Sequence, residues 1–146
     1  MSRTAKSSFL VLPLLVAALS VAAGTAPGDS AGARPRTIAS YCSQSGDVCY
    51  GIFNRSGKVY LEITTAARYF RRYTLCVRRL PVSSDAEHAQ RCGSFPVFRR
   101  SGSTWGSSVN YARQYPLKFP ARYRVSWKLG GRPLGPALYF RLPLAG

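Results

Sequence analysis

Acidic residues are scarce in this chain: five Asp and Glu stand against 21 Lys and Arg among 146 residues, a formal net charge of +16. The chain also has a single histidine, His88. The side chains that form a catalytic pair of carboxylates, or that serve as the base of a catalytic nucleophile, are therefore scarce. We therefore expect no enzyme activity and no cofactor, and a charge excess of this size favours polyanionic partners.

Long stretches with helical periodicity are missing as well, and the N-terminal apolar run from Phe9 to Leu19 is shorter than the roughly 20 residues that a membrane helix needs. Two basic residues, Arg3 and Lys6, precede this run, and small residues follow it from Ser20 to Ala33. This pattern predicts a secretory signal peptide at residues 1–23, with residue 33 as the latest cleavage position. We expect a flexible leader at 24–37, one domain at 38–146, and Sec-type export.

The chain has four cysteines, Cys42, Cys49, Cys76 and Cys92. Their spacing lacks the close Cys pairs or the Cys/His cluster of a zinc site, so we expect no metal. Export would place them in an oxidising compartment, where two disulfides form. Four cysteines allow three pairings. We favour 42 with 49, across a polar turn, and 76 with 92, across two strand-like runs.

Short runs with two-residue alternation recur along the domain and predict an all-β fold of about seven or eight short antiparallel strands. In Lys58–Thr65 the apolar Val59, Leu61 and Ile63 fall on one face. Alternation is equally clear in Arg122–Leu129. The expected strands are 48–53, 58–65, 73–80, 91–98, 104–111, 122–129 and 138–142. We expect a turn at 99–103 and an irregular connection at 112–120.

The segment Phe119–Trp127, followed by a turn and a final strand, resembles the last hairpin of immunoglobulin-like and fibronectin-type domains. The resemblance implies an immunoglobulin-like β-sandwich in which Tyr123 is the tyrosine of the tyrosine corner. Val125 stands where that family has its second cysteine, so the resemblance implies no inter-sheet disulfide. The whole chain is also similar to small secreted proteins of actinomycete type, a likeness that implies no particular activity.

Three arginine doublets are the candidate anion-binding residues. Neighbours on a strand point to opposite faces, so each doublet should lie at a strand end, near a turn. If these ends converge, they form a basic rim suited to phosphate or carboxylate. The doublets are Arg71-Arg72, Arg78-Arg79 and Arg99-Arg100.

Aromatic residues lie among the basic ones, in Arg68–Tyr73 and around Tyr111 and Tyr115. Stacking rings beside cations suit single-stranded nucleic acid or an anionic glycan. The alternative is that these rings are core residues and the arginines are solvated. Trp105 is likewise either a carbohydrate platform or a core residue.

Isolated polar residues offer weaker candidates. His88 follows Asp85 and Glu87 in an acidic stretch that we expect to be a solvated loop. Glu62 is one member of a conceivable glycosidase-like pair, but among so many arginines we expect surface ion pairing.

Two functional hypotheses follow. The first is a secreted, non-enzymatic binding module for an anionic cell-wall polymer or another polyanion. The alternative is a secreted inhibitor or effector that presents Val82–Gln90 to a protein partner.

Overall fold

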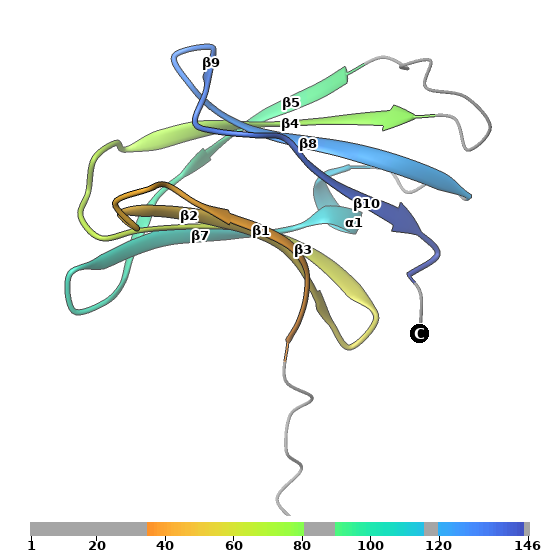
Figure 1. Cartoon of the computed structure of the whole chain (residues 1–146), viewed down its shortest axis with the longest axis horizontal. Coiled ribbons are helices and arrows are strands. Elements are labelled where there is room, and N and C mark those ends of the chain that lie inside the picture. Colours follow the sequence, from red (N-terminus) through yellow and green to blue (C-terminus); the bar gives the residue numbers. More distant parts are fainter. Residues whose placement is uncertain (1–34, 81–89, 116–119, 145–146) are drawn as a thin grey trace, which may run out of the picture. The chain divides into compact units, whose positions relative to one another are not determined.

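The computed structural model describes residues 35–80, 90–115 and 120–144, all within the compact unit Ala31–Gly146. This unit consists of two antiparallel sheets packed face to face, with one helical turn between β7 and β8 (Figure 1). Its elements are β1 (Arg36–Cys42), β2 (Val48–Arg55), β3 (Lys58–Thr65), β4 (Arg72–Leu80), β5 (Gln90–Pro96), β6 (Phe98–Ser101), β7 (Thr104–Asn110), α1 (Tyr111–Gln114), β8 (Ala121–Leu129), β9 (Arg132–Pro133) and β10 (Leu138–Leu142).

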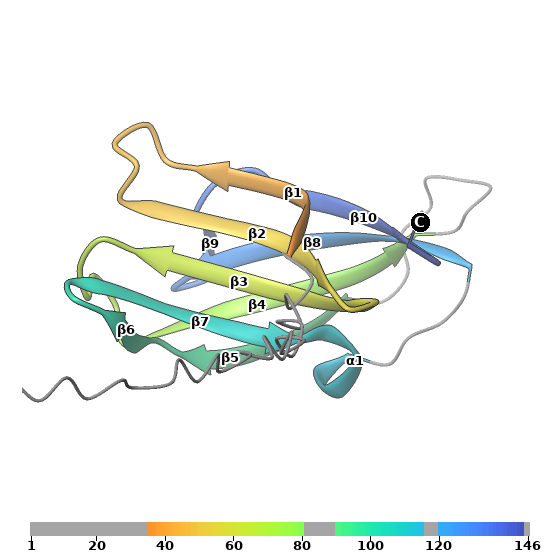
Figure 2. The ribbon, with the colours of Figure 1, turned by 90° about the horizontal axis from the view of Figure 1, so that it is seen from below.

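The strand order matches the immunoglobulin-like arrangement. One sheet has the order β1-β2-β3-β7-β6, and the other has β10-β8-β4-β5, with β9 pairing on β8 (Figure 2). Strands β2-β3-β7-β6 and β10-β8-β4-β5 correspond to the A-B-E-D and G-F-C-C′ sheets of that fold. β1 adds a strand outside β2. The predicted fold class is thus confirmed, although the described residues form more than the seven or eight expected strands because β1, β6 and β9 were not anticipated.

Two local predictions were wrong. Arg36 and Thr37 belong to β1 rather than to a leader, and their backbones pair with Asn54 and Phe53 of β2. Residues 98–101, expected to be largely turn, form β6 and pair with β7 in the first sheet. The chain changes sheets at the buried Val97, directly after Pro96, whose missing N–H makes it a natural strand end.

The expected irregular connection after β7 begins with the helical turn α1. Tyr111 and the residue that ends this turn, Tyr115, are both buried. The Tyr115 hydroxyl donates a 2.7 Å hydrogen bond to the Leu75 carbonyl oxygen of β4. Burial of these two rings and the hydrogen bond to β4 hold the turn against the second sheet. An alternating pattern of short strands does not reveal such a contact.

Aromatic side chains connect the two sheets. Trp127 of β8 stacks on Tyr50 of β2 with ring centroids 4.5 Å apart. Tyr73 of β4 shares a 3.3 Å hydrogen bond with the Ser107 hydroxyl of β7. Each buried ring of this size removes much apolar surface from water, which is the main stabilising contribution available to a small domain. The sandwich therefore depends on inward-facing aromatic residues from both sheets.

Both predicted disulfides are present, and each joins two neighbouring strands within one sheet. Cys42 and Cys49 are directly opposite each other on β1 and β2, with a sequence separation of 7. Cys76 and Cys92 are opposite on β4 and β5, with a separation of 16. No disulfide joins the two sheets, as the valine at position 125 implied. Disulfides of this kind indicate an oxidising, non-cytoplasmic compartment.

Replacing Cys76 and Cys92 with alanine is expected to lower the free energy of unfolding by about 3 kcal/mol, because the unfolded chain gains the freedom of a longer loop. Replacing Cys42 and Cys49 should cost about 2.5 kcal/mol on the same grounds. Urea denaturation of both variants measures these losses. A loss below about 1 kcal/mol in both would show that the disulfides do not stabilise the domain.

Stability should fall in alkaline solution because buried tyrosines resist ionisation. Burial raises the pKa of Tyr73 and of Tyr50 from 10.0 to about 12. The folded state thus keeps protons that the unfolded chain has lost, so this stability is fully present below pH 10 and decreases as the pH rises toward 12. Tyr73 alone contributes about 1.4 kcal/mol per pH unit. In denaturation series at several pH values, Tyr73→Phe should show a shallower alkaline decrease, and an unchanged slope would contradict this assignment.

Candidate anion-binding surface

Strand β8 separates its side chains into a buried set and a basic set. Ala121, Tyr123, Val125 and Trp127 are buried between the sheets. Arg122, Arg124, Ser126 and Lys128 alternate with them and therefore lie on the outer face of the second sheet. A single strand thus supplies both part of the core and a line of cations.

Neighbouring strands add cations on the same outer face. Arg78 of β4 is directly opposite Arg124, and Arg141 of β10 is directly opposite Arg122. Tyr139 of β10 is opposite Arg124 on its other side. We call this set the basic face, and it comprises Arg78, Arg122, Arg124, Lys128, Tyr139 and Arg141.

The arginines of the basic face are closely spaced. Adjacent strands lie about 4.8 Å apart, and residues two apart on a strand are separated by about 6.8 Å. Four arginines therefore originate from a small patch of backbone. Strands β4, β5, β8 and β10 contain no Asp or Glu. Like charges directly opposite each other repel, and these couples concentrate positive charge on one face of the second sheet.

Tyr139 gives the basic face an aromatic surface. Its side chain is 41% exposed, although the neighbouring Leu138 and Phe140 are buried. The Arg122 guanidinium lies over the ring, 4.8 Å from its centroid. The attraction between the guanidinium group and the face of the ring holds the positive charge of Arg122 beside Tyr139.

The predicted arginine doublets do not converge on one site. Arg72 begins β4, and Arg78 lies six residues further along it, which corresponds to about 20 Å. Arg72 donates hydrogen bonds to the side chain and carbonyl oxygens of Ser94, and Arg71 precedes the strand. Arg79 is opposite Tyr123 and so lies on the other side of β4 from Arg78.

The third doublet lies on β6, the outermost strand of the first sheet. Arg99 and Arg100 are both exposed, and Arg99 donates a 2.7 Å hydrogen bond to the Gly102 carbonyl oxygen. Charged residues on an edge strand hinder pairing with a second chain. Of the six predicted residues, the structure places Arg78 on the basic face. The other members form the polar half of the alternating strand 122–129 and of the final strand, and this alternation is the sequence signal that marks them.

Most of the aromatic residues near the basic segments belong to the core or its margin. Tyr111 and Tyr115 are buried and stack at 5.7 Å. Burial raises the pKa of both hydroxyls. Trp105 is half-buried, with the Arg68 guanidinium 4.9 Å from its ring centroid, whereas Tyr69 is 54% exposed. Tyr111 and Tyr115 are therefore core residues rather than parts of a binding surface.

Tyr123 is buried in β8, the strand that corresponds to strand F. Its ring stacks on Phe140 at 5.0 Å and meets Tyr111 edge-on at 5.4 Å. This places Tyr123 beside the connection that precedes its strand, as in a tyrosine corner. The specific backbone hydrogen bond of that motif remains a prediction.

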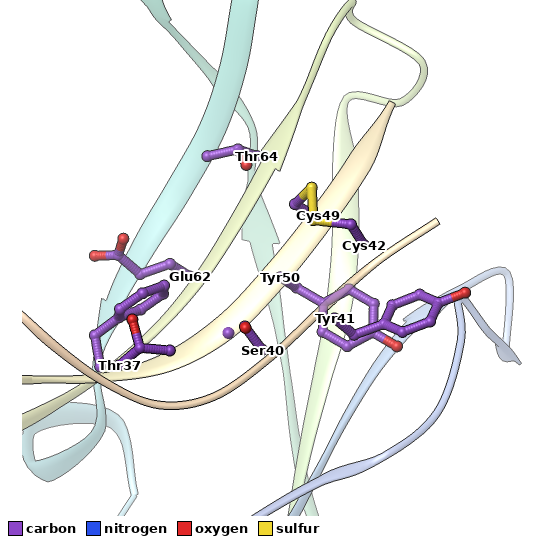
Figure 3. Close-up of a pocket in the computed structure, with 10 residues that line it drawn as sticks. Thr37, Ser40, Tyr41, Cys42, Cys49, Tyr50, Glu62 and Thr64 are labelled. Carbon is purple, nitrogen blue, oxygen red and sulfur yellow. A yellow bond between two sulfur atoms is a disulfide. The ribbon is translucent and has the colours of Figure 1, made fainter. Parts of the chain in front are cut away.

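The first sheet carries a different kind of hollow on its outer side, with a volume of about 200 Å³ (Figure 3). Its lining includes Thr37, Ser40, Thr64 and the Cys42–Cys49 disulfide. Glu62 also lines it, and this carboxylate forms an ion pair with Arg55 at 2.6 Å and accepts a hydrogen bond from Ser108. The ion pairing expected for Glu62 is confirmed. Among the residues that the structure describes, this lining contains a carboxylate and no cation, which does not suit an anion.

Other sequence candidates fall outside the described residues. These are His88, and the Val82–Gln90 loop except for Gln90 itself. Across residues 35–80, 90–115 and 120–144 there is no group of three His, Cys, Asp or Glu side chains that could hold a metal ion. Within the same ranges no helix is long and apolar enough to cross a membrane. Comparison of the chain with protein-family models, with curated proteins and with solved structures found no match in any of the three.

Arg141→Gln is expected to raise the free energy of unfolding in the absence of any ligand, because it relieves the repulsion with Arg122. The gain should be between a few tenths and about 1 kcal/mol in low salt, and it should vanish in concentrated salt. Arg100→Gln on β6 removes the same charge from a distant exposed position and serves as the control. Urea denaturation at two ionic strengths measures both. A destabilised Arg141→Gln would show that the arginine pair assists folding.

Proposed function

We propose that this protein is a secreted, non-enzymatic binding module whose basic face holds a polyanion, such as an anionic cell-wall polymer. The polymer lies across β4, β8 and β10 and supplies the negative charge that those strands lack. Arginine forks bind phosphate or carboxylate oxygens in pairs, and Tyr139 offers a flat surface for the parts of the polymer between its charges.

The observation that carries this proposal is the pair of arginine couples that face each other across strands, Arg78 with Arg124 and Arg122 with Arg141. These couples bring four guanidinium groups together on one face, and strands β4, β5, β8 and β10 of that sheet contain no Asp or Glu. Guanidinium groups so close together can contact several phosphate or carboxylate oxygens of one polymer at once.

Two further features support a role outside the cell. The disulfides belong to an oxidising compartment, and the N-terminal segment has the pattern of an export signal. The high positive charge also favours rapid capture of negatively charged polymers and retention near their surface.

The test uses protein made from the full coding sequence in an exporting host and purified with its disulfides oxidised. Retention on immobilised polyphosphate is measured as a function of salt concentration, where binding should weaken steeply. The Arg122→Gln/Arg141→Gln double variant should bind less tightly, and its salt slope should fall by about 1 for each phosphate contact removed.

The matched control is Arg99→Gln/Arg100→Gln, which removes the same charge from β6. If binding depends on the basic face, the control keeps the salt slope of the parent protein. Equal losses in both double variants would show that net charge alone causes retention. Retention no stronger than that of a neutral sandwich protein at physiological ionic strength would exclude the proposal.

A further inference from the structure

A second hollow lies at the side of the sandwich where β1 and β10 come together. β1 is the outermost strand of the first sheet, β10 is the outermost strand of the second, and the two are in contact. The hollow has a volume of about 230 Å³, below the roughly 300 Å³ at which pockets for drug-sized ligands begin. It therefore suits one small group rather than a large ligand. Its lining consists of Arg36, Thr37, Ile38, Asn54, Arg141 and Leu144.

The polar part of this lining has the chemistry of an anion site. Arg36 and Arg141 bring two guanidinium groups from different sheets, and the described residues of the lining include no Asp or Glu. Ile38 and Leu144 supply apolar surface, which lowers the local dielectric constant and strengthens charge interactions. Arg141 also belongs to the basic face, so the hollow opens beside the surface that holds the polymer.

The amide oxygen of Asn54, which also lines the hollow, is occupied by a hydrogen bond within the protein. This oxygen, Oδ1, accepts a 2.9 Å hydrogen bond from the Gly57 N–H in the turn between β2 and β3. The other end of the amide is the Nδ2 group, which only donates hydrogen bonds. Asn54 is also opposite Arg36 in the β1–β2 register, so donors from neighbouring strands meet at this place.

We infer that this hollow, here called the side hollow, binds a tetrahedral oxyanion of the phosphate type. A carboxylate has two oxygens to satisfy, whereas donor-bearing side chains from three strands, Arg36, Asn54 and Arg141, match a group with three or four oxygens. The inference rests on the proposed function and names the charged group of its polymer. Chain phosphates contact the basic face, and one phosphate, for instance at a chain end, enters the side hollow.

The test is a titration of isotope-labelled protein with inorganic phosphate, sulfate and acetate at constant ionic strength, followed by the backbone amide signals. Phosphate should shift the amides of Arg36, Thr37 and Asn54, and acetate should not. A response to phosphate alone identifies a phosphate polymer as the source, and an equal response to sulfate identifies the tetrahedral group in general, which includes sulfated glycans. Equal responses to all three anions, or no response, would overturn the inference.

Asn54→Asp is the most informative variant. One oxygen of the new carboxylate can still accept the hydrogen bond from the Gly57 N–H, while a negatively charged oxygen replaces the Nδ2 donor. Phosphate binding should weaken by at least about tenfold, since an anion then faces a carboxylate. Arg36→Gln should weaken phosphate binding as well, and it tests the site independently if Asn54→Asp fails to fold. Arg100→Gln is the control, with the same change in charge and unchanged binding. Equal phosphate binding by parent and Asn54→Asp would refute the site.

The same variants separate this inference from the proposed function. Asn54→Asp leaves the four guanidinium groups of the basic face in place, so its salt-dependent retention on polyphosphate should persist. Loss of the phosphate response with retention intact supports the side hollow as a discrete site. Retention by the parent without any phosphate response overturns the side hollow alone, and absence of both overturns the function with it.

Discussion

The two-residue period of the β-strand is the constraint on which the rest of this structure depends. In β8 it directs Tyr123, Val125 and Trp127 into the space between the sheets and leaves Arg122 and Arg124 on the outside. A shift of one residue in register would bury guanidinium groups and expose the aromatic rings. The same strand register therefore specifies both the core and the basic face.

The domain is held by different interactions in different directions. Within a sheet, each disulfide joins strands that are already paired, so it restricts the unfolded chain more than it shapes the folded one. Between the sheets, the Tyr50–Trp127 stack and the rings around Tyr111 provide the contact. This division explains how an immunoglobulin-like topology persists without a disulfide that crosses the core.

Charge is distributed unevenly between the two sheets. The first sheet carries Glu62, which is neutralised locally by Arg55, and its exposed edge carries the arginines of β6. The second sheet places arginines opposite arginines, and the side hollow continues this positive surface onto β1. This asymmetry is the basis of the proposal that one face binds a negatively charged polymer.

The amino-acid sequence alone determined the all-β class and the position of most strands, because alternation and turn residues act over short distances. It favoured the observed disulfide pairing among the three that four cysteines allow. It did not reveal β1, whose place depends on pairing with β2, or the change of sheet at Val97. The arginine doublets were misleading for the same reason: adjacency in sequence puts two side chains on opposite faces, whereas Arg78 and Arg124 lie together through strand register. Only tertiary structure decides register across distant strands, since it results from how the two inner faces pack.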